Sequence, residues 1–296
     1  MSSTSAKEIT DMPYIETTDS TRLFYFDWGT GKPVVFIHGW AVGAESWEYQ
    51  LKYFADQGFR AIAADTRGCG RSDDPGRNYD FDTLAEDLAA VLNKLDLTDV
   101  TLVTHSMGAG TASRYLSKYG SDRVEKAVFI APTTPFLLKT EDNPNGIDKA
   151  NFDQGLAALM DDRPHYLNAM APAFFGADLP GFALSPEIQQ WLVGLAQRAS
   201  MQTSVGLYRT NTETDLRADV GRVTVPTHII HADHDYGNPL ELSSAATQRL
   251  IPGSTLTVYE NAGHGLIITH KDRINREILE FILPSGMVSS PGVTMS

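Results

Sequence analysis

The chain has 296 residues, 42% of them hydrophobic, and carries a formal net charge of −13 at pH 7. Such a length supports a large buried core in one α/β domain, with room for an inserted subdomain. An acidic surface repels nucleic acid and anionic membranes, so neither is expected as a partner. No apolar run of about 18 residues, the length that can span a membrane, occurs in the sequence.

The two ends of the chain and its single cysteine give further expectations. Residues 1–12 lack the apolar segment of a signal peptide. Small and polar residues dominate them, as Ser, Gly and Pro do residues 285–296, so both ends are predicted to be flexible tails. Because Cys69 is the only cysteine, no internal disulfide can form. A reducing compartment suits the chain, so we expect a cytoplasmic protein. Cys69 lies in a Gly-rich loop without a partner motif, so catalysis by its thiol is not expected.

Short apolar runs recur along the chain at the spacing of strands. Most of them are continuous, which is typical of strands covered on both faces of a sheet. The predicted strands are Tyr14–Thr17, Leu23–Asp27, Val34–Ile37, Ala61–Ala64, Val100–Val103, Ala127–Ile130, His228–Ile230 and Thr255–Tyr259.

Helical periodicity separates several of these strands. Apolar residues recur at three- and four-residue spacing from Phe81 to Leu95 and from Ala112 to Tyr119, where Gly120 is the expected C-cap. A last helix runs from Ile274 to Ile282 before Pro284. Alternating strands and helices predict an α/β fold with a mostly parallel central sheet flanked by helices.

The alternation stops in residues 133–219, where helical pieces, prolines and aromatic residues replace the strands. We interpret this segment as a helical cap inserted after the sixth strand. The predicted core then comprises residues 13–132 and 220–284. A cap above the strand ends would wall a substrate pocket. The alternative is a helical excursion that packs on the core and contacts no ligand.

The most informative motif is Thr104-His105-Ser106-Met107-Gly108, which joins a predicted strand to a predicted helix. A serine at such a strand-to-helix turn is the nucleophile elbow of the α/β-hydrolase fold, usually written Gly-x-Ser-x-Gly. Thr104 stands where the first glycine is usual. The motif therefore predicts that fold with Ser106 as nucleophile, provided that an acid and a base follow.

A serine hydroxyl needs a base to take its proton, and the base needs an orienting carboxylate. His264 follows the strand ending at Tyr259 and is flanked by glycines, so it is the predicted base. Asp233 and Asp235 both follow the strand ending at Ile230. Asp235 lies further beyond that strand, where the acid of this fold is expected, and is the predicted third member.

The oxyanion of an acyl-transfer intermediate needs two N–H donors. One is expected from Met107, the residue after the nucleophile, and the other from Trp40 in the loop after the first parallel strand. Aromatic residues of the segment 133–219 suggest an apolar pocket, and the candidates are Phe136, Phe152, Phe174, Phe175 and Trp191.

Metal and nucleotide sites were weighed as alternatives. His228, His231 and His234 have three-residue spacing, but side chains alternate along a strand, so His228 and His231 point to opposite faces. Residues 65–72 are Gly-rich and follow a strand, yet they lack the lysine of a phosphate-binding loop. We therefore expect no metal and no cofactor.

Five segments together resemble the cofactor-free haloperoxidase group of α/β-hydrolases, which includes aryl esterases, perhydrolases and γ-lactamases. They are Phe36–Trp40, Asp65–Ser72, the elbow at Ser106, Leu138–Gly146 and Ala262–Gly265, and the similarity spans most of residues 13–283. The resemblance implies a triad of Ser106, Asp235 and His264, with Trp40 and Met107 at the oxyanion hole. It implies neither haem nor metal. Ala41 stands where members with marked perhydrolase activity often have proline, which lowers the expectation of perhydrolysis.

The sequence thus predicts a serine hydrolase (a carboxylic-ester hydrolase) that cleaves small to medium, aryl or apolar esters through an acyl-enzyme. Its partner is a small molecule, and a homo-oligomer is left open. One rival is the same machinery acting on a lactone or cyclic amide, or as a perhydrolase. A dehalogenase or epoxide hydrolase is disfavoured, since it needs a carboxylate at position 106. A non-catalytic ligand-binding protein on the same fold is the second rival.

Overall fold

The computed structural model describes residues 13–283, so the two predicted tails lie outside the described residues. Eight strands form one sheet in the order β1-β2-β4-β3-β5-β6-β7-β8. Their bounds are β1 Tyr14–Glu16, β2 Arg22–Trp28, β3 Pro33–Ile37, β4 Arg60–Ala64, β5 Val100–His105, β6 Val124–Ile130, β7 Thr227–Ala232 and β8 Thr255–Tyr259. Strands β1 and β2 pair antiparallel with their neighbours, and the rest pair parallel, as predicted.

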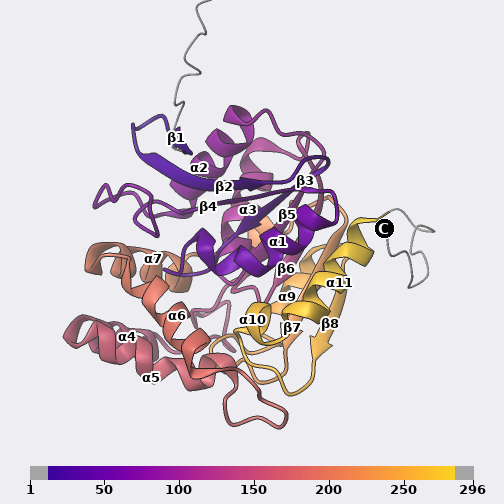
Figure 1. Cartoon of the computed structure of the whole chain (residues 1–296). Coiled ribbons are helices and arrows are strands. Elements are labelled where there is room, and N and C mark those ends of the chain that lie inside the picture. Colours follow the sequence, from indigo (N-terminus) through magenta and orange to yellow (C-terminus); the bar gives the residue numbers. More distant parts are fainter. Residues whose placement is uncertain (1–12, 284–296) are drawn as a thin grey trace, which may run out of the picture.

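Helices cover both faces of this sheet (Figure 1). On one face α1 packs against β3 and β4, where Phe54 meets Phe36, and α11 packs beside α1 and contacts β7 and β8 through Glu277. On the other face α2 and α3 pack through residues such as Ile62 and Leu92. These helices, with the shorter ones of the core, are η1 Ala44–Trp47, α1 Glu48–Asp56, α2 Phe81–Lys94, α3 Gly108–Tyr119, α9 Ser244–Leu250, α10 Leu266–Thr269 and α11 Lys271–Ile282.

Between β6 and β7 the chain forms only helices, which confirms the predicted helical insertion after the sixth strand. They are α4 Lys149–Asp161, α5 Arg163–Phe175, α6 Pro186–Gln197, α7 Met201–Glu213 and α8 Arg217–Val220. Helices α4 to α7, here called the helical insert, lie together beside the sheet in Figure 1. Side-chain oxygens of Asp162, Ser185 and Ser200 accept N–H groups in the first turns of α5, α6 and α7. Within residues 13–283 no helix is long and apolar enough to cross a membrane.

The Gly-rich turn at residues 65–72 connects several elements of the core. Asp65 accepts hydrogen bonds from the backbone N–H groups of Ala44 and Arg71. Arg67 is buried and bonds to two carboxylates, those of Asp87 and Asp19. The turn therefore ties β4 to η1, to α2 and to the segment before β2.

A second polar cluster fixes the last helix to the sheet. Glu277 on α11 receives a hydrogen bond from the Tyr259 hydroxyl at 2.6 Å and lies 2.8 Å from the His228 ring nitrogen Nε2. The other ring nitrogen of His228 lies 2.7 Å from the Thr255 hydroxyl. Burial by itself raises the pKa of Glu277, but hydrogen bonds from His228, Tyr259 and Thr257 outweigh it and lower the pKa to about 2.

This cluster predicts a loss of stability in acid. Because the pKa of Glu277 falls from 4.5 to about 2 on folding, its stabilisation is complete above pH 4.5 and is lost as the pH falls toward 2. Urea unfolding of the wild type and of Glu277→Gln, measured between pH 7 and pH 3, checks this. We expect the free-energy difference between the two proteins to shrink as the pH falls. A constant difference would contradict the role of the carboxylate.

Candidate active site

Ser106 occupies a strained turn between β5 and α3. Its φ is +55°, in the left-handed region that non-glycine residues rarely adopt. The ladder to β6 continues through the turn, because the Ser106 N–H donates to the Ile130 carbonyl at 2.9 Å. Gly108 is required here, since a Cβ on it would lie 2.5 Å from the Ile37 carbonyl oxygen. The close approach of α3 to the end of β3 therefore fixes the elbow.

Thr104 fits this turn without distorting it. Its side chain is fully buried, and its hydroxyl lies 3.4 Å from the Val128 carbonyl on β6. The backbone of Thr104 pairs in register with Ile37 and Phe129, as an ordinary strand residue does. Glycine is therefore not needed at position 104.

His264 and Asp235 meet across the loops that follow β8 and β7. The Nδ1–H of His264 donates to Asp235 Oδ2 at 2.5 Å, and both side chains are largely buried. Burial by itself raises the pKa of Asp235, but the charge and hydrogen bond of His264 outweigh it and hold that pKa below its ordinary value. Asp235 is thus kept as a carboxylate that orients the imidazole.

The structure also separates Asp235, the acid predicted from the sequence, from its neighbour Asp233. Asp233 accepts the backbone N–H groups of Asn261 and Ala262 and contacts the ring of His234. It therefore shapes the loop that leads to His264 and makes no contact with the His264 ring. Asp235 is the carboxylate on the histidine.

Two neighbours of this pair were missed from the sequence. Asn238 donates its backbone N–H to Asp235 Oδ1 at 3.0 Å, and its side-chain amide lies 3.3 Å from the same oxygen. His105 lies 3.0 Å from the His264 carbonyl through Nε2, with the two rings 4.8 Å apart. Burial and the nearby His264 lower the pKa of His105 to about 3, so its ring is neutral and Nε2–H donates to that carbonyl. The only signal in the sequence was their closeness along the chain to Asp235 and to Ser106.

Two backbone N–H groups near Ser106 remain available as donors. In the described part of the chain, neither Trp40 nor Met107 donates its backbone N–H to another group. The indole N–H of Trp40 donates to the Ser204 carbonyl on α7 at 3.0 Å, which holds the loop after β3 against the helical insert. His38 accepts the N–H of Thr66 and ties the same loop to the end of β4.

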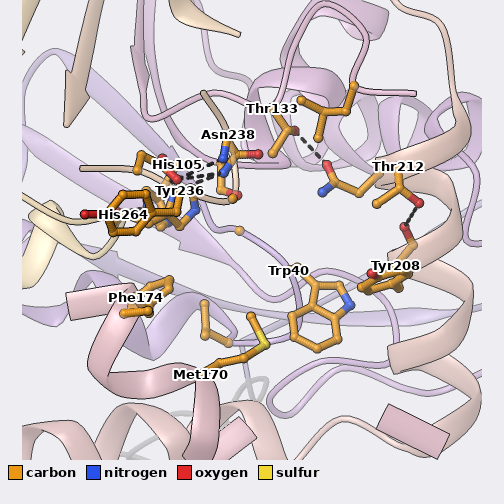
Figure 2. A pocket seen from close by; sticks show the side chains of 18 of the residues that line it. Trp40, His105, Thr133, Met170, Phe174, Tyr208, Thr212, Tyr236, Asn238 and His264 are labelled. Carbon is orange, nitrogen blue, oxygen red and sulfur yellow. Dashed lines mark hydrogen bonds and ion pairs between the residues drawn. The ribbon is translucent and has the colours of Figure 1, made fainter. Parts of the chain in front are cut away.

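A cavity of about 350 Å³ opens between the helical insert and the loops that carry Ser106, Asp235 and His264. Figure 2 shows Trp40, Met170, Phe174, Tyr208 and His264 around it. Of the predicted pocket aromatics, Phe152 and Phe174 line this cavity. Phe175 lines a smaller adjoining apolar pocket of about 80 Å³ that shares Trp40, Val42, Met170, Phe174 and Leu192 with it.

Two predicted pocket residues lie elsewhere, so their assignment needs correction. Phe136 is buried away from the cavity, with the Arg217 guanidinium 5.3 Å above its ring. Trp191 packs edge-on against Tyr49 of α1, at 6.2 Å between ring centres, and joins α6 to the core. Composition indicated aromatic residues in this segment but could not say which side of each helix faces the cavity. Tyr166, Met170, Tyr208 and Asn211, which do line it, were missed for the same reason.

The histidines that raised the question of a metal site lie apart. His228 contacts Thr255 and Glu277, His231 contacts the Ser244 hydroxyl, and His234 contacts Asp233. Each therefore has a different protein partner. Cys69 is fully buried, and burial raises the pKa of its thiol, so it is not poised as a nucleophile.

These features define an α/β-hydrolase, and comparison with known proteins agrees. The family model described as alpha/beta hydrolase fold matches residues 32–271, so the chain belongs to this family and is a hydrolase of this class. The chain is 37% identical to the non-heme chloroperoxidase CPO-A1 of Kitasatospora aureofaciens, covering 92% of this chain and 99% of that one.

Two further similar proteins indicate which group of α/β-hydrolases the chain resembles. It is 34% identical to the bifunctional esterase/perhydrolase DCH of Acinetobacter calcoaceticus, covering 92% and 99% of the two chains. The crystal structure of a bromoperoxidase from Bacillus anthracis superposes with a TM-score of 0.87 at 36% identity, covering 91% and 98%. The resemblance to the cofactor-free haloperoxidase and esterase group is therefore confirmed.

Proposed function

We propose that the protein is a serine hydrolase that cleaves carboxylic esters through an acyl-enzyme on Ser106. The observation that carries the proposal is the 2.5 Å hydrogen bond from His264 Nδ1 to the buried Asp235, in a cavity that is also lined by Ser106, a serine held at a φ of +55°. The esterase/perhydrolase relative supports the choice of esters as the bond that is cleaved.

The proposed reaction has two halves, formation and hydrolysis of the acyl-enzyme, and the same residues act in both. Ser106 Oγ attacks the ester carbonyl while His264 Nε2 takes its proton, and Asp235 stabilises the imidazolium that forms. The backbone N–H groups of Trp40 and Met107 donate to the oxyanion. His264 then protonates the departing alcohol. Water repeats the sequence on the acyl-enzyme, with His264 again as base, and releases the acid.

The helical insert serves in this proposal as a cap over the reacting bond. Its residues Phe152, Met170, Phe174 and Leu192 line the cavity and present apolar side chains to the substrate. A cavity of about 350 Å³ suits small to medium esters with aryl or alkyl groups. Residues 133–219 would then be the cap, between core segments 13–132 and 220–284.

Perhydrolysis is the second candidate, because one relative is named for both activities. Hydrogen peroxide would then attack the acyl-enzyme in place of water, the bond between the acyl group and Ser106 Oγ would break, and the product would leave as a peracid. Ala41 has a φ of +62°, which proline cannot adopt, so this loop differs from one with proline at that position. A panel of esters, lactones and cyclic amides, with and without peroxide, would rank ester hydrolysis, hydrolysis of lactones or cyclic amides, and perhydrolysis.

The proposal is tested with a fluorophosphonate probe on the intact protein. We expect one label per chain, located on Ser106 by peptide mass spectrometry, and no label on Ser106→Ala. Thermal unfolding of the variant provides the control for folding. Undiminished labelling of Ser106→Ala would exclude Ser106 as the nucleophile. Failure to cleave any short aryl ester would favour the non-catalytic alternative.

Thr104→Gly is expected to retain activity. The change removes a long hydrogen bond of 3.4 Å and loosens a strand that its neighbours hold in register. The effect on the transition state should stay below about 1 kcal/mol, so kcat/KM should remain within about tenfold of wild type. Initial rates on a short aryl ester check this. Complete loss of activity would assign Thr104 a role that its contacts do not suggest.

A further inference from the structure

One end of the cavity is polar, although apolar side chains line most of it. Thr133 follows β6, and its backbone N–H lies 3.5 Å from the Ser106 carbonyl. Its hydroxyl donates to Asn211 Oδ1 on α7 at 2.6 Å, a bond drawn in Figure 2 beside the label of Thr133. Both residues line the cavity, so an amide is held in a defined orientation near the nucleophile.

The amide nitrogen of Asn211 is a donor at this end of the cavity that has no partner among the described residues. Its oxygen is occupied by Thr133, and within residues 13–283 its Nδ2 donates no hydrogen bond. Neighbouring polar groups are committed elsewhere: the Thr212 hydroxyl donates to the Tyr208 carbonyl and the Tyr208 hydroxyl to the Phe152 carbonyl. The half-buried Asn211 thus presents two N–H donors to the cavity.

The position of His264 decides which part of a substrate meets this donor. His264 must protonate the departing alcohol, so the alcohol lies beside it, near Phe174 and Tyr236. Figure 2 shows these three residues at one end of the cavity and Trp40, Tyr208 and Thr212 at the other. Asn211 neighbours Thr212 on α7 and therefore belongs to the end occupied by the acyl group.

Charge limits the acyl group further. The described residues that line the cavity include no lysine or arginine, and their one carboxylate, Asp235, is bound to His264. A carboxylate on the acyl group would be buried there without a counter-ion, at a high desolvation cost. A neutral oxygen would satisfy the Asn211 donor without that cost.

We propose that Asn211 selects substrates whose acyl group carries a neutral hydrogen-bond acceptor, such as an ether, keto or hydroxyl oxygen. This inference rests on the proposed esterase function and names the substrate class of the same site. Asn211 acts here as a specificity-determining residue. A plain alkanoate leaves its donor unpaired, whereas an oxygen-substituted acid pairs with it.

Isosteric esters test the proposal. Phenyl pentanoate is compared with phenyl ethoxyacetate and phenyl 3-methoxypropanoate, in which an oxygen replaces one methylene of the acyl chain. For each enzyme we take the ratio of kcat/KM for the better ether ester to that for the pentanoate. Since intrinsic reactivity cancels between enzymes, the change in this ratio on mutation reports the contact alone.

In Asn211→Leu, which keeps the volume but removes the donor, the ratio is expected to fall about tenfold. The kcat/KM for the pentanoate should change far less. Asn211→Asp, of nearly the same shape, should lower the ratio as well, because a carboxylate cannot donate. Asn168→Leu is the matched control on α5: Asn168 is exposed and outside the cavity, so its ratio should equal that of wild type.

An unchanged ratio in Asn211→Leu and Asn211→Asp, or a parallel loss for all esters, would overturn the proposal. Faster turnover of an acyl group ending in a carboxylate would overturn the assignment of a neutral acceptor. Fluorophosphonate labelling of Ser106 in each variant shows whether the site is intact. If the wild type cleaves none of these esters, the esterase proposal fails instead, and the two failures are thereby distinguished.

Discussion

Replacing Asp235 by asparagine should lower kcat by about 10³- to 10⁴-fold while the protein stays folded. The carboxylate accepts the Nδ1–H of His264 at 2.5 Å, and its pKa is held below the ordinary value, so it is charged when, in the proposed mechanism, the imidazole takes the serine proton. An amide cannot neutralise the imidazolium, and its NH₂ group favours the wrong tautomer. Initial rates on a short aryl ester, with urea unfolding as a check, measure the effect.

Asp233→Asn provides the matched control for this result. The two aspartates lie in the same loop, two residues apart, but Asp233 bonds to the backbone N–H groups of Asn261 and Ala262 and not to the His264 ring. We expect kcat to fall less than about tenfold, through a small displacement of the loop that carries His264. Equal losses in the two variants would contradict the separation of their roles.

Arg67→Ala should cost about 3 to 5 kcal/mol of the free energy of unfolding. The Arg67 side chain is 2% exposed and forms two ion pairs, with Asp87 at 2.6 Å and Asp19 at 2.8 Å. Removing the guanidinium leaves the buried Asp87 carboxylate without its counter-ion and opens a cavity beside α2. Urea denaturation at neutral pH measures the loss.

Arg22→Ala tests whether burial, and not the pairing of charges, produces that cost. Arg22 also pairs with an aspartate, Asp73, at 2.9 Å, but its side chain is 59% exposed. Water already solvates these charges, so the midpoint of unfolding should hardly move. A loss comparable to that of Arg67→Ala would contradict the explanation.

Apolar runs predicted the strands well because a strand buried on both faces is a nearly continuous apolar run. Pro33–Ile37 is of this kind, as is Arg60–Ala64 after its first residue, and both were predicted to within one residue at each end. Ser244–Leu250 was missed because its buried residues, Ser244 and Thr247, are polar and make no apolar stripe. Glu48–Asp56 was also missed, since Gln50 is one of its three buried residues.

Some residues of the candidate site could be predicted from the local sequence, whereas others depend on how distant segments pack. The order of Ser106, Asp235 and His264 along the chain, and their places after strands, were visible in the sequence. Asn211 and Tyr208 were not, because a residue of the helical insert reaches the cavity only through the packing of whole helices. Trp191 shows the same limit, since its ring packs on Tyr49 of α1.

The pairing of β6 with β7 has a consequence for which changes in sequence length the fold can tolerate. Ile130 and Ile230 are partners in the sheet although a hundred residues separate them. The entropy of closing so long a loop depends weakly on its length, at about 0.6 kcal/mol for each doubling. The segment between them can therefore be lengthened, shortened or exchanged with little penalty to the sheet. A new wall for the cavity can thus be acquired while the loops that carry Ser106, Asp235 and His264 keep their places.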